Sequence, residues 1–301
     1  MKLTGLHLLL SYQCTFECDH CFVWGSPGQS GVMTGVTLGR ILQEARDAAT
    51  VEWIYFEGGE PFLYYAILLA GVRAAARAGF KVGVVSNAYW ATCEADAVAW
   101  LKPIAGDIQD LSISDDLYHS GDRPDPRPGH ALAAAGQLGI PATILSVAIP
   151  EAAEAPAAMG QLPPGQSAVM LRGRAAATLA ARFAPRPWSD FTACPHEDLR
   201  TPGRVHVDPF GNLHLCQGLA LGNLLRTPLR DICRDYTPEA HPIAGPLLAG
   251  GPAELVRRYE LPHAAGYGDA CHLCDAARRA LRDRFPEILT PDQMYGVAAG
   301  T

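Results

Sequence analysis

The 301-residue sequence lacks any long hydrophobic run and is poor in lysine, of which it has only Lys2, Lys81 and Lys102. A helix that crosses a bilayer needs about 20 consecutive apolar residues, and the apolar stretch at residues 6–10 is too short for that. A basic segment followed by a small-residue cleavage site is also missing, so we expect neither a signal peptide nor a membrane span. The net charge of −7 argues against a nucleic acid partner.

What the sequence does contain fits an enzyme of the cytoplasm. Hydrophobic residues make up 49% of the chain and charged residues 18%, which is typical of soluble globular proteins. The nine cysteines are odd in number, and several are separated by only two or three residues. Such spacing fits a disulfide framework poorly and indicates metal binding in a reducing compartment. We therefore expect a cytoplasmic, oxygen-sensitive metalloprotein.

The first cysteine group is Cys14, Cys18 and Cys21, in C-x3-C-x2-C spacing and followed directly by Phe22. Three thiolates leave one iron of a 4Fe–4S cluster without a protein ligand. An open iron can bind a substrate or cofactor, as the free position of a catalytic zinc does. A zinc site completed by His20 is the alternative that these residues leave open.

This spacing resembles the signature of radical S-adenosylmethionine (radical SAM) enzymes. The resemblance implies that the open iron chelates the amino and carboxylate groups of S-adenosylmethionine (SAM). One electron then cleaves a C–S bond and yields a 5′-deoxyadenosyl radical. The family relies on an external one-electron donor such as flavodoxin or ferredoxin.

A second motif strengthens the resemblance. Residues 57–61 read Glu-Gly-Gly-Glu-Pro and follow the second expected strand. Glycine permits close approach of a backbone to a ligand, although a Gly-Gly pair also occurs in ordinary turns. The segment is similar to the GGEP motif that contacts the SAM amino group in this family. The resemblance therefore implies that Gly58, Gly59 and Glu60 help to bind SAM.

The pattern of short apolar runs alternating with helical stretches predicts an α/β fold with a parallel sheet. We expect a partial (βα)6 TIM-like barrel over residues 1–185, followed by a small C-terminal α+β cluster-binding domain over 186–301. The expected strands are residues 6–11, 51–57, 81–87, 108–114, 142–149 and 167–172. The expected helices lie near residues 37–49, 64–78, 94–104, 129–138, 152–159, 174–183 and 275–285.

Polar residues at the carboxyl ends of these strands are candidate ligands, because ligand sites of such barrels collect there. Ser86 and Asn87 end the third strand, at a position that often contacts the ribose or the methionine carboxylate in the family. Ser112 and Asp115 belong to the end of the fourth, and Asp115 is a candidate proton acceptor. Arg172 and Arg174 follow the sixth and are candidates for pairing with a carboxylate. A turn, a helix N-cap and a solvated arginine are the ordinary alternatives.

The second cysteine group lies in the C-terminal part. It supplies four thiolates, enough to close a second cluster. They are Cys194, Cys216 at the end of an expected hairpin over residues 204–216, and the pair Cys271-x2-Cys274. The pattern resembles the SPASM or twitch extension of radical SAM enzymes, in its shorter form with one auxiliary cluster. The 16-residue gap between Cys194 and Gly211 is longer than usual. A zinc knuckle would satisfy the same cysteines.

The remaining cysteines and the neighbouring histidines receive ordinary roles. Cys93 is expected to be a structural thiol. Cys233 is a possible substitute ligand for the second group, but its apolar helical context favours a buried core thiol. Most of the histidines near the second group are expected to be surface or packing residues, namely His196, His206, His214, His263 and His272.

Together these features predict a radical SAM enzyme that abstracts a hydrogen atom from its substrate. Modification of a ribosomally made peptide is our first interpretation. The short segment before the first strand leaves no room for a leader-recognition domain, so a separate recognition protein would supply that role. A small-molecule (sugar or natural-product) dehydrogenase or tailoring enzyme is the alternative. A non-catalytic metal-binding protein is the alternative from another class.

Overall fold

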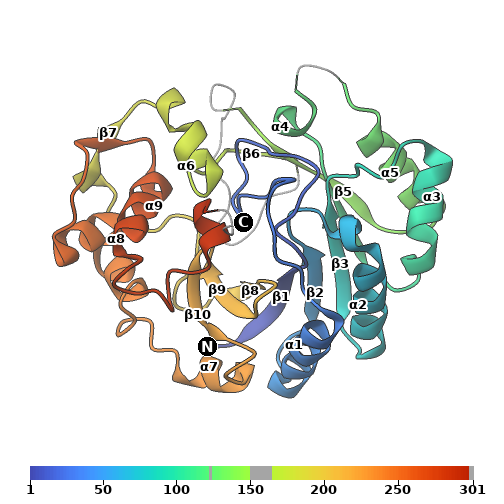
Figure 1. Cartoon of the computed structure of the whole chain (residues 1–301), viewed down its shortest axis with the longest axis horizontal. Helices are drawn as coiled ribbons and strands as arrows, with labels where there is room; N and C mark the ends of the chain where they lie inside the picture. Colours follow the sequence, from blue (N-terminus) through green and yellow to red (C-terminus); the bar gives the residue numbers. More distant parts are fainter. Residues whose placement is uncertain (122–123, 150–164, 298–301) are drawn as a thin grey trace.

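The computed structural model describes residues 1–121, 124–149 and 165–297, and over these ranges the chain builds one nine-stranded sheet (Figure 1). Its strand order is β10-β9-β8-β1-β2-β3-β4-β5-β6. Strands β1 to β6 and β8 pair in parallel, while β9 runs antiparallel to β8 and β10. The strands are β1 Leu3–Leu9, β2 Trp53–Glu57, β3 Lys81–Ser86, β4 Asp110–Ser114, β5 Ala142–Val147, β6 Gly165–Ser167, β8 Gly203–Val207, β9 Asn212–Cys216 and β10 Leu219–Asn223. A small separate pair joins β7 Arg186–Pro187 to β11 Gly266–Tyr267.

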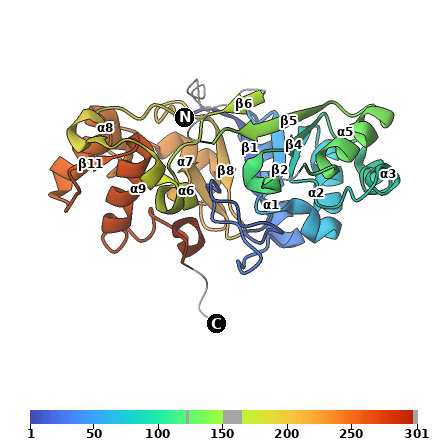
Figure 2. The same cartoon turned by 90° about the horizontal axis from the view of Figure 1, so that it is seen from above.

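Helices on the outer face of the parallel strands give the expected α/β architecture. The helices of the N-terminal half are α1 Gly35–Ala48, α2 Tyr65–Arg77, α3 Glu94–Leu101, α4 Leu117–Ser120, α5 Arg127–Gln137 and α6 Arg174–Thr178. Those of the C-terminal part are α7 Leu229–Asp235, α8 Ala244–Tyr259 and α9 Ala270–Leu281. Short 3-10 turns are η1 Pro61–Tyr64, η2 Lys102–Ile104, η4 Ala180–Arg182, η5 Trp188–Asp190 and η6 Asp292–Tyr295. Figure 2 shows α8 and α9 at the opposite end of the molecule from α3 and α5.

The sheet stays open, as a partial barrel does. Strands β6 and β10 are the two ends of the strand order, so the sheet does not close on itself. None of the helices in the described ranges has the length and apolar character that crossing a membrane requires. The α/β partial barrel predicted from the sequence is therefore confirmed.

The strand sequences separate an apolar outer face from a polar inner face. Leu6 and Leu8 of β1 and Phe56 of β2 are fully buried in the core beneath the helices. Alternate residues of a strand point to opposite faces, and the intervening residues, His7 and Glu57 among them, line a cavity. The inner face is therefore available for binding instead of being filled as a core.

The sixth strand differs from the prediction. We expected it over residues 167–172, but β6 ends at Ser167 and pairs only with the end of β5. Beyond it the backbone N–H of Leu171 donates to the Asp269 carboxylate, and Val169 and Leu171 pack in a small cluster with Leu179. The apolar pattern that suggested a strand thus reflects local packing. The helix expected near residues 152–159 lies outside the described residues.

The hairpin predicted over residues 204–216 is formed by β8 and β9 and belongs to the same sheet as the barrel. Strand β8 pairs in parallel with β1, with Val205 opposite Leu6 and Val207 opposite Leu8. The C-terminal part therefore continues the barrel sheet, and the division at residue 185 stays a prediction. Strand β10 and helix α8 were not anticipated from the sequence.

The hairpin turn is fixed by Asp208, whose side chain is completely buried. Its carboxylate accepts hydrogen bonds from the hydroxyl of Tyr12 and from the backbone N–H groups of Phe210 and Asn212, and lies 3.1 Å from Nε2 of His214. Asp208→Ala leaves these donors, among them the buried Tyr12 hydroxyl, without an acceptor. We expect the free energy of unfolding to fall by about 3–5 kcal/mol, measured by anaerobic denaturant titration.

Asp198 supplies the matched control for this prediction. Its carboxylate accepts from the backbone N–H groups of Arg200 and Thr201, but in an exposed turn. We expect Asp198→Ala to lower the free energy of unfolding by only about 1 kcal/mol, the net contribution of ordinary hydrogen bonds. Equal losses in the two variants would show that burial of Asp208 does not matter.

Candidate active site

The loop after β1 carries Cys14, Cys18 and Cys21. Cys14 and Cys18 are buried and Cys21 is partly buried. The backbone N–H of Phe16 donates to Cys14 Sγ (3.4 Å), and that of Gly25 donates to Cys21 Sγ (3.1 Å). Burial raises the pKa of Cys14 to about 12 and raises the pKa of Cys18 as well. Thiols in this setting become thiolates only with a positive partner, so the donor set fits a metal centre.

The donor set suits an iron–sulfur cluster. Three thiols supply ligands for three irons of a cubane 4Fe–4S cluster, which binds each thiolate on a separate iron and leaves the fourth iron open. A single zinc ion in a structural site would need a fourth ligand.

Glu60, Ser86 and Asn87 form one hydrogen-bonded group beside this loop. The Glu60 carboxylate is fully buried and accepts from the Ser86 hydroxyl (3.0 Å) and the Asn87 backbone N–H (2.8 Å). The side-chain amide of Asn87 in turn donates to Cys14 Sγ at 3.5 Å. Burial raises the pKa of Glu60 to about 7. The structure therefore brings these three expected cofactor-binding residues together, at Cys14.

Gly58 and Gly59 lie against the same loop. The N–H of Gly59 donates to the Ser11 carbonyl at 2.7 Å. A Cβ atom would lie 2.5 Å from the Ser11 oxygen if added to Gly58, and 2.1 Å from the Gln13 oxygen if added to Gly59. The glycines are thus needed for the close approach of two backbone segments.

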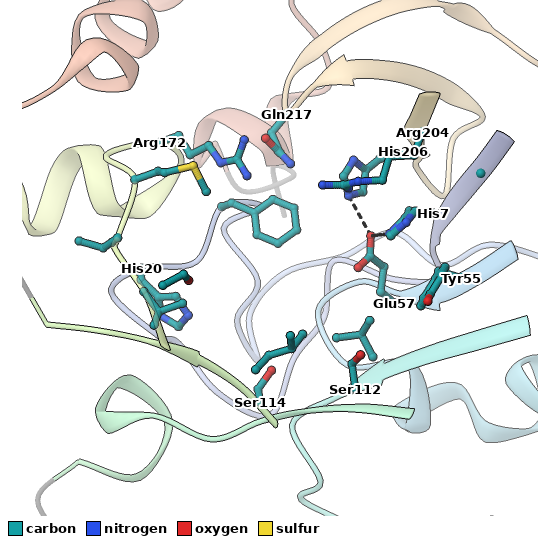
Figure 3. A pocket seen from close by; sticks show the side chains of 18 of the residues that line it. His7, His20, Tyr55, Glu57, Ser112, Ser114, Arg172, Arg204, His206 and Gln217 are labelled. Carbon is teal, nitrogen blue, oxygen red and sulfur yellow. Dashed lines mark hydrogen bonds and ion pairs between the residues drawn. The ribbon is translucent and has the colours of Figure 1, made fainter. Parts of the chain in front are cut away.

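A cavity of about 520 Å³ occupies the inner face of the sheet next to the cysteine loop. Figure 3 shows His20 on one side of it and the group His7, Glu57 and His206 on the other. His20 and Phe22, which flank Cys21, both line it. The other polar residues of its wall are Thr4, Tyr55, Ser112, Ser114, Asp116, Ser167, Arg172, Arg204 and Gln217.

The two expected arginines have different surroundings. Arg174 is buried, and its guanidinium donates to the carbonyls of Cys18 (2.7 Å) and Gly25 (2.8 Å). It therefore holds the cysteine loop and is not free to pair with a substrate carboxylate. Arg172 lines the cavity, lies over the Phe22 ring at 5.7 Å and pairs with Glu197 at 2.8 Å.

Of the two aspartates after β4, Asp116 faces the cavity and Asp115 does not line it. Asp116 caps α4 by accepting from the N–H groups of Tyr118 and His119. Asp115 donates its backbone N–H to the Leu145 carbonyl, which extends the strand pairing. The role of Asp115 as proton acceptor stays a prediction, without support from its position.

The four C-terminal cysteines meet around a second, small cavity although they are distant in sequence. Cys194, Cys216, Cys271 and Cys274 all line it, together with Arg172 and Arg278. Burial raises the pKa of Cys274 to about 12 and raises those of Cys194 and Cys271 as well. The Arg278 guanidinium is buried, and its Nε has no hydrogen-bond partner among the described residues. Four thiols beside the buried Arg278 and the partly buried Arg172 fit an anionic metal–thiolate cluster.

The other cysteines lie elsewhere. Cys93 is exposed and caps α3 by accepting from the Asp96 N–H. Cys233 packs against the barrel core. Neither lines the four-cysteine cavity.

Sequence reasoning missed the inner-face residues His7, Glu57 and His206. We expected most histidines near the second cysteine group to be surface or packing residues, which holds for the exposed His263, but His206 lines the cavity. The available signal was a polar residue at alternate positions of an apolar strand, as in Leu6-His7-Leu8.

The N-terminal part of the chain is similar to a known family. Residues 8–115, about a third of the chain, match the Radical SAM superfamily, whose members use a 4Fe–4S cluster and SAM. A protein of Bacillus subtilis (strain 168) named for peptide biosynthesis, YydG, is 26% identical over 112 residues. That alignment covers 37% of this chain and 35% of YydG, so the chain matches about a third of the length of this relative.

One solved structure supports the same fold, and a second is reported beside it. The crystal structure of BtrN in complex with AdoMet and 2-DOIA has a TM-score of 0.50 at 14% identity, covering 77% of this chain and 82% of BtrN. Native anSMEcpe with bound AdoMet and Cp18Cys peptide has a TM-score of 0.48 at 13% identity, covering 94% of this chain and 97% of that one. At these identities the likeness to BtrN shows the fold alone.

Proposed function

We propose that this protein is a radical SAM enzyme that abstracts a hydrogen atom from a substrate bound in the inner-face cavity. Cys14, Cys18 and Cys21 would hold a 4Fe–4S cluster, which supplies the electron that cleaves SAM to a 5′-deoxyadenosyl radical. One observation carries the proposal: the loop with Cys14, Cys18 and Cys21 borders the polar cavity directly, through His20 and Phe22. A radical formed at this loop would be next to the bound substrate.

The chain's own residues orient the site and exclude water. Glu60, Ser86 and Asn87 fix the loop at Cys14, and Arg174 fixes it at Cys18. The apolar outer layer of the sheet closes the cavity floor to solvent. Arg172 and Ser112 offer a cation and a hydroxyl to the substrate from the cavity wall.

We further propose that Cys194, Cys216, Cys271 and Cys274 hold a second 4Fe–4S cluster. The supporting observation is that Arg172 lines both the substrate cavity and the four-cysteine cavity. A cluster there would lie close enough to accept the electron left on a substrate radical, which makes the net reaction an oxidation. Reducing equivalents for SAM cleavage would come from a flavodoxin or ferredoxin.

For the substrate we propose a ribosomally made peptide. The support is the sequence likeness to YydG, which is named for peptide biosynthesis. A separate leader-recognition protein would then present the peptide. The second candidate is a small molecule, such as a sugar or natural product, because a cavity of about 520 Å³ also suits a ligand of that size.

The test is anaerobic reconstitution followed by reduction with dithionite in the presence of SAM. We expect about eight irons per chain, as two cubanes require, and formation of 5′-deoxyadenosine. Deuterium transfer into 5′-deoxyadenosine from a deuterated peptide, or from a deuterated sugar, would identify the substrate class. Zinc bound at the N-terminal cysteines, or SAM left intact after reduction, would refute the proposal.

A further inference from the structure

The cavity wall opposite His20 carries His7, Glu57 and His206, which come from the neighbouring strands β1, β2 and β8 (Figure 3). Glu57 Oε1 lies 3.2 Å from His7 Nδ1 and 2.9 Å from His206 Nε2. The three possible ligand atoms all lie within 4.8 Å of one another. Strand pairing places His7 beside His206, so the sheet backbone fixes this arrangement.

These separations match the edges of a metal coordination shell. Nitrogen and oxygen ligands lie about 2.1 Å from a transition-metal ion, which puts adjacent ligands roughly 3.0–3.4 Å apart. Two histidines and one carboxylate are a common ligand set for divalent transition metals, with further positions left open. The same separations also allow a hydrogen-bonded relay in which both imidazoles donate to Glu57.

The three side chains are open to the cavity and are not sealed within the core. The side chains of His7, Glu57 and His206 are 15%, 12% and 11% exposed, and this exposure is toward the cavity.

The second group of this kind, His20, Asp116 and His119, is less suited. The Asp116 carboxylate is already engaged by the backbone N–H groups of Tyr118, His119 and Val147. His20 lies 3.8 Å from the nearest Asp116 oxygen.

We propose that His7, Glu57 and His206 bind one divalent transition-metal ion whose open positions face the cavity. The ion takes an oxygen or nitrogen donor of the substrate, such as a carboxylate or a peptide carbonyl, and anchors it near the cysteine loop. This site goes beyond the proposed radical chemistry, and its occupation does not depend on SAM cleavage.

Zinc alone is the probe, added to the reconstituted holoenzyme without SAM or substrate. We expect equilibrium dialysis with elemental analysis to find about one zinc per chain, with the iron content unchanged. His206→Asn and Glu57→Gln each weaken zinc binding by at least about 100-fold, since loss of a ligand exceeds the effect of losing its supporting contacts. Retained iron in these variants shows that they still fold.

Two further variants make the result specific. His263→Asn removes an exposed histidine and is expected to bind zinc like wild type. His119→Asn alters the second group and is also expected to leave binding intact. The proposal is overturned if wild type binds no zinc beyond its clusters, or if His206→Asn and Glu57→Gln bind zinc like wild type. 5′-Deoxyadenosine formation, measured separately, reports on the radical chemistry and not on this site.

Discussion

Alanine at Cys18 is expected to abolish 5′-deoxyadenosine formation, whereas alanine at both Cys271 and Cys274 is expected to leave it within about threefold of wild type. Cys18 is one of only three thiols on this loop. The loop has no further sulfur that could replace the Cys18 thiolate as an iron ligand. Cys271 and Cys274 line a separate cavity. We therefore expect the two cysteine sets to act on different steps.

The measurement is made without substrate. It counts the SAM molecules cleaved per chain after reduction with dithionite. Each variant should hold about four irons instead of about eight. Cys93→Ala serves as the control, since Cys93 is exposed at the start of α3, and should behave like wild type. Loss of SAM cleavage in the Cys271/Cys274 double variant would mean that the two sets are not independent.

The barrel strands were predictable because their pattern is local. Apolar runs such as residues 51–57 and 81–87 match β2 and β3 closely, and helical stretches separate them. The sixth strand was not predictable, because Val169 and Leu171 are apolar for a different reason: they pack on Leu179 rather than extend the sheet. Helix α8 was missed since Gly250, Gly251 and Pro252 interrupt its sequence; Gly250 and Gly251 are non-helical within it.

The candidate site likewise contains residues that a local sequence pattern predicted and residues that no local pattern could predict. Cys14, Cys18 and Cys21 sit within one short loop, so their spacing alone indicated a metal centre. The grouping of His7, Glu57 and His206 depends on which strands pair and in what register, and residues about 50 and 200 positions apart carry no local signal of this. The parallel pairing of β1 with β8, which creates the group, was not foreseen.

The second large prediction concerns Arg174, which holds the cysteine loop in place through hydrogen bonds. The guanidinium is buried and donates to the carbonyls of Cys18 and Gly25, while its backbone N–H donates to the Cys21 carbonyl. It also lies 5.4 Å from the Trp24 ring. Arg174→Ala leaves two carbonyls without donors, at about 1–3 kcal/mol each, and removes the side chain that fills the space under the loop.

We therefore expect Arg174→Ala to lose the N-terminal cluster while keeping the C-terminal one, with about four irons per chain and SAM cleavage at least about 100-fold slower. Arg230→Ala is the matched control, because the Arg230 side chain is 70% exposed on α7, and should hold about eight irons. Arg174→Lys keeps the positive charge but replaces the guanidinium fork with a single ammonium group. We therefore expect the N-terminal cluster to be only partly incorporated. Full iron content and full SAM cleavage in Arg174→Ala would mean that the cysteines alone define the loop, and that the buried guanidinium contributes only to packing.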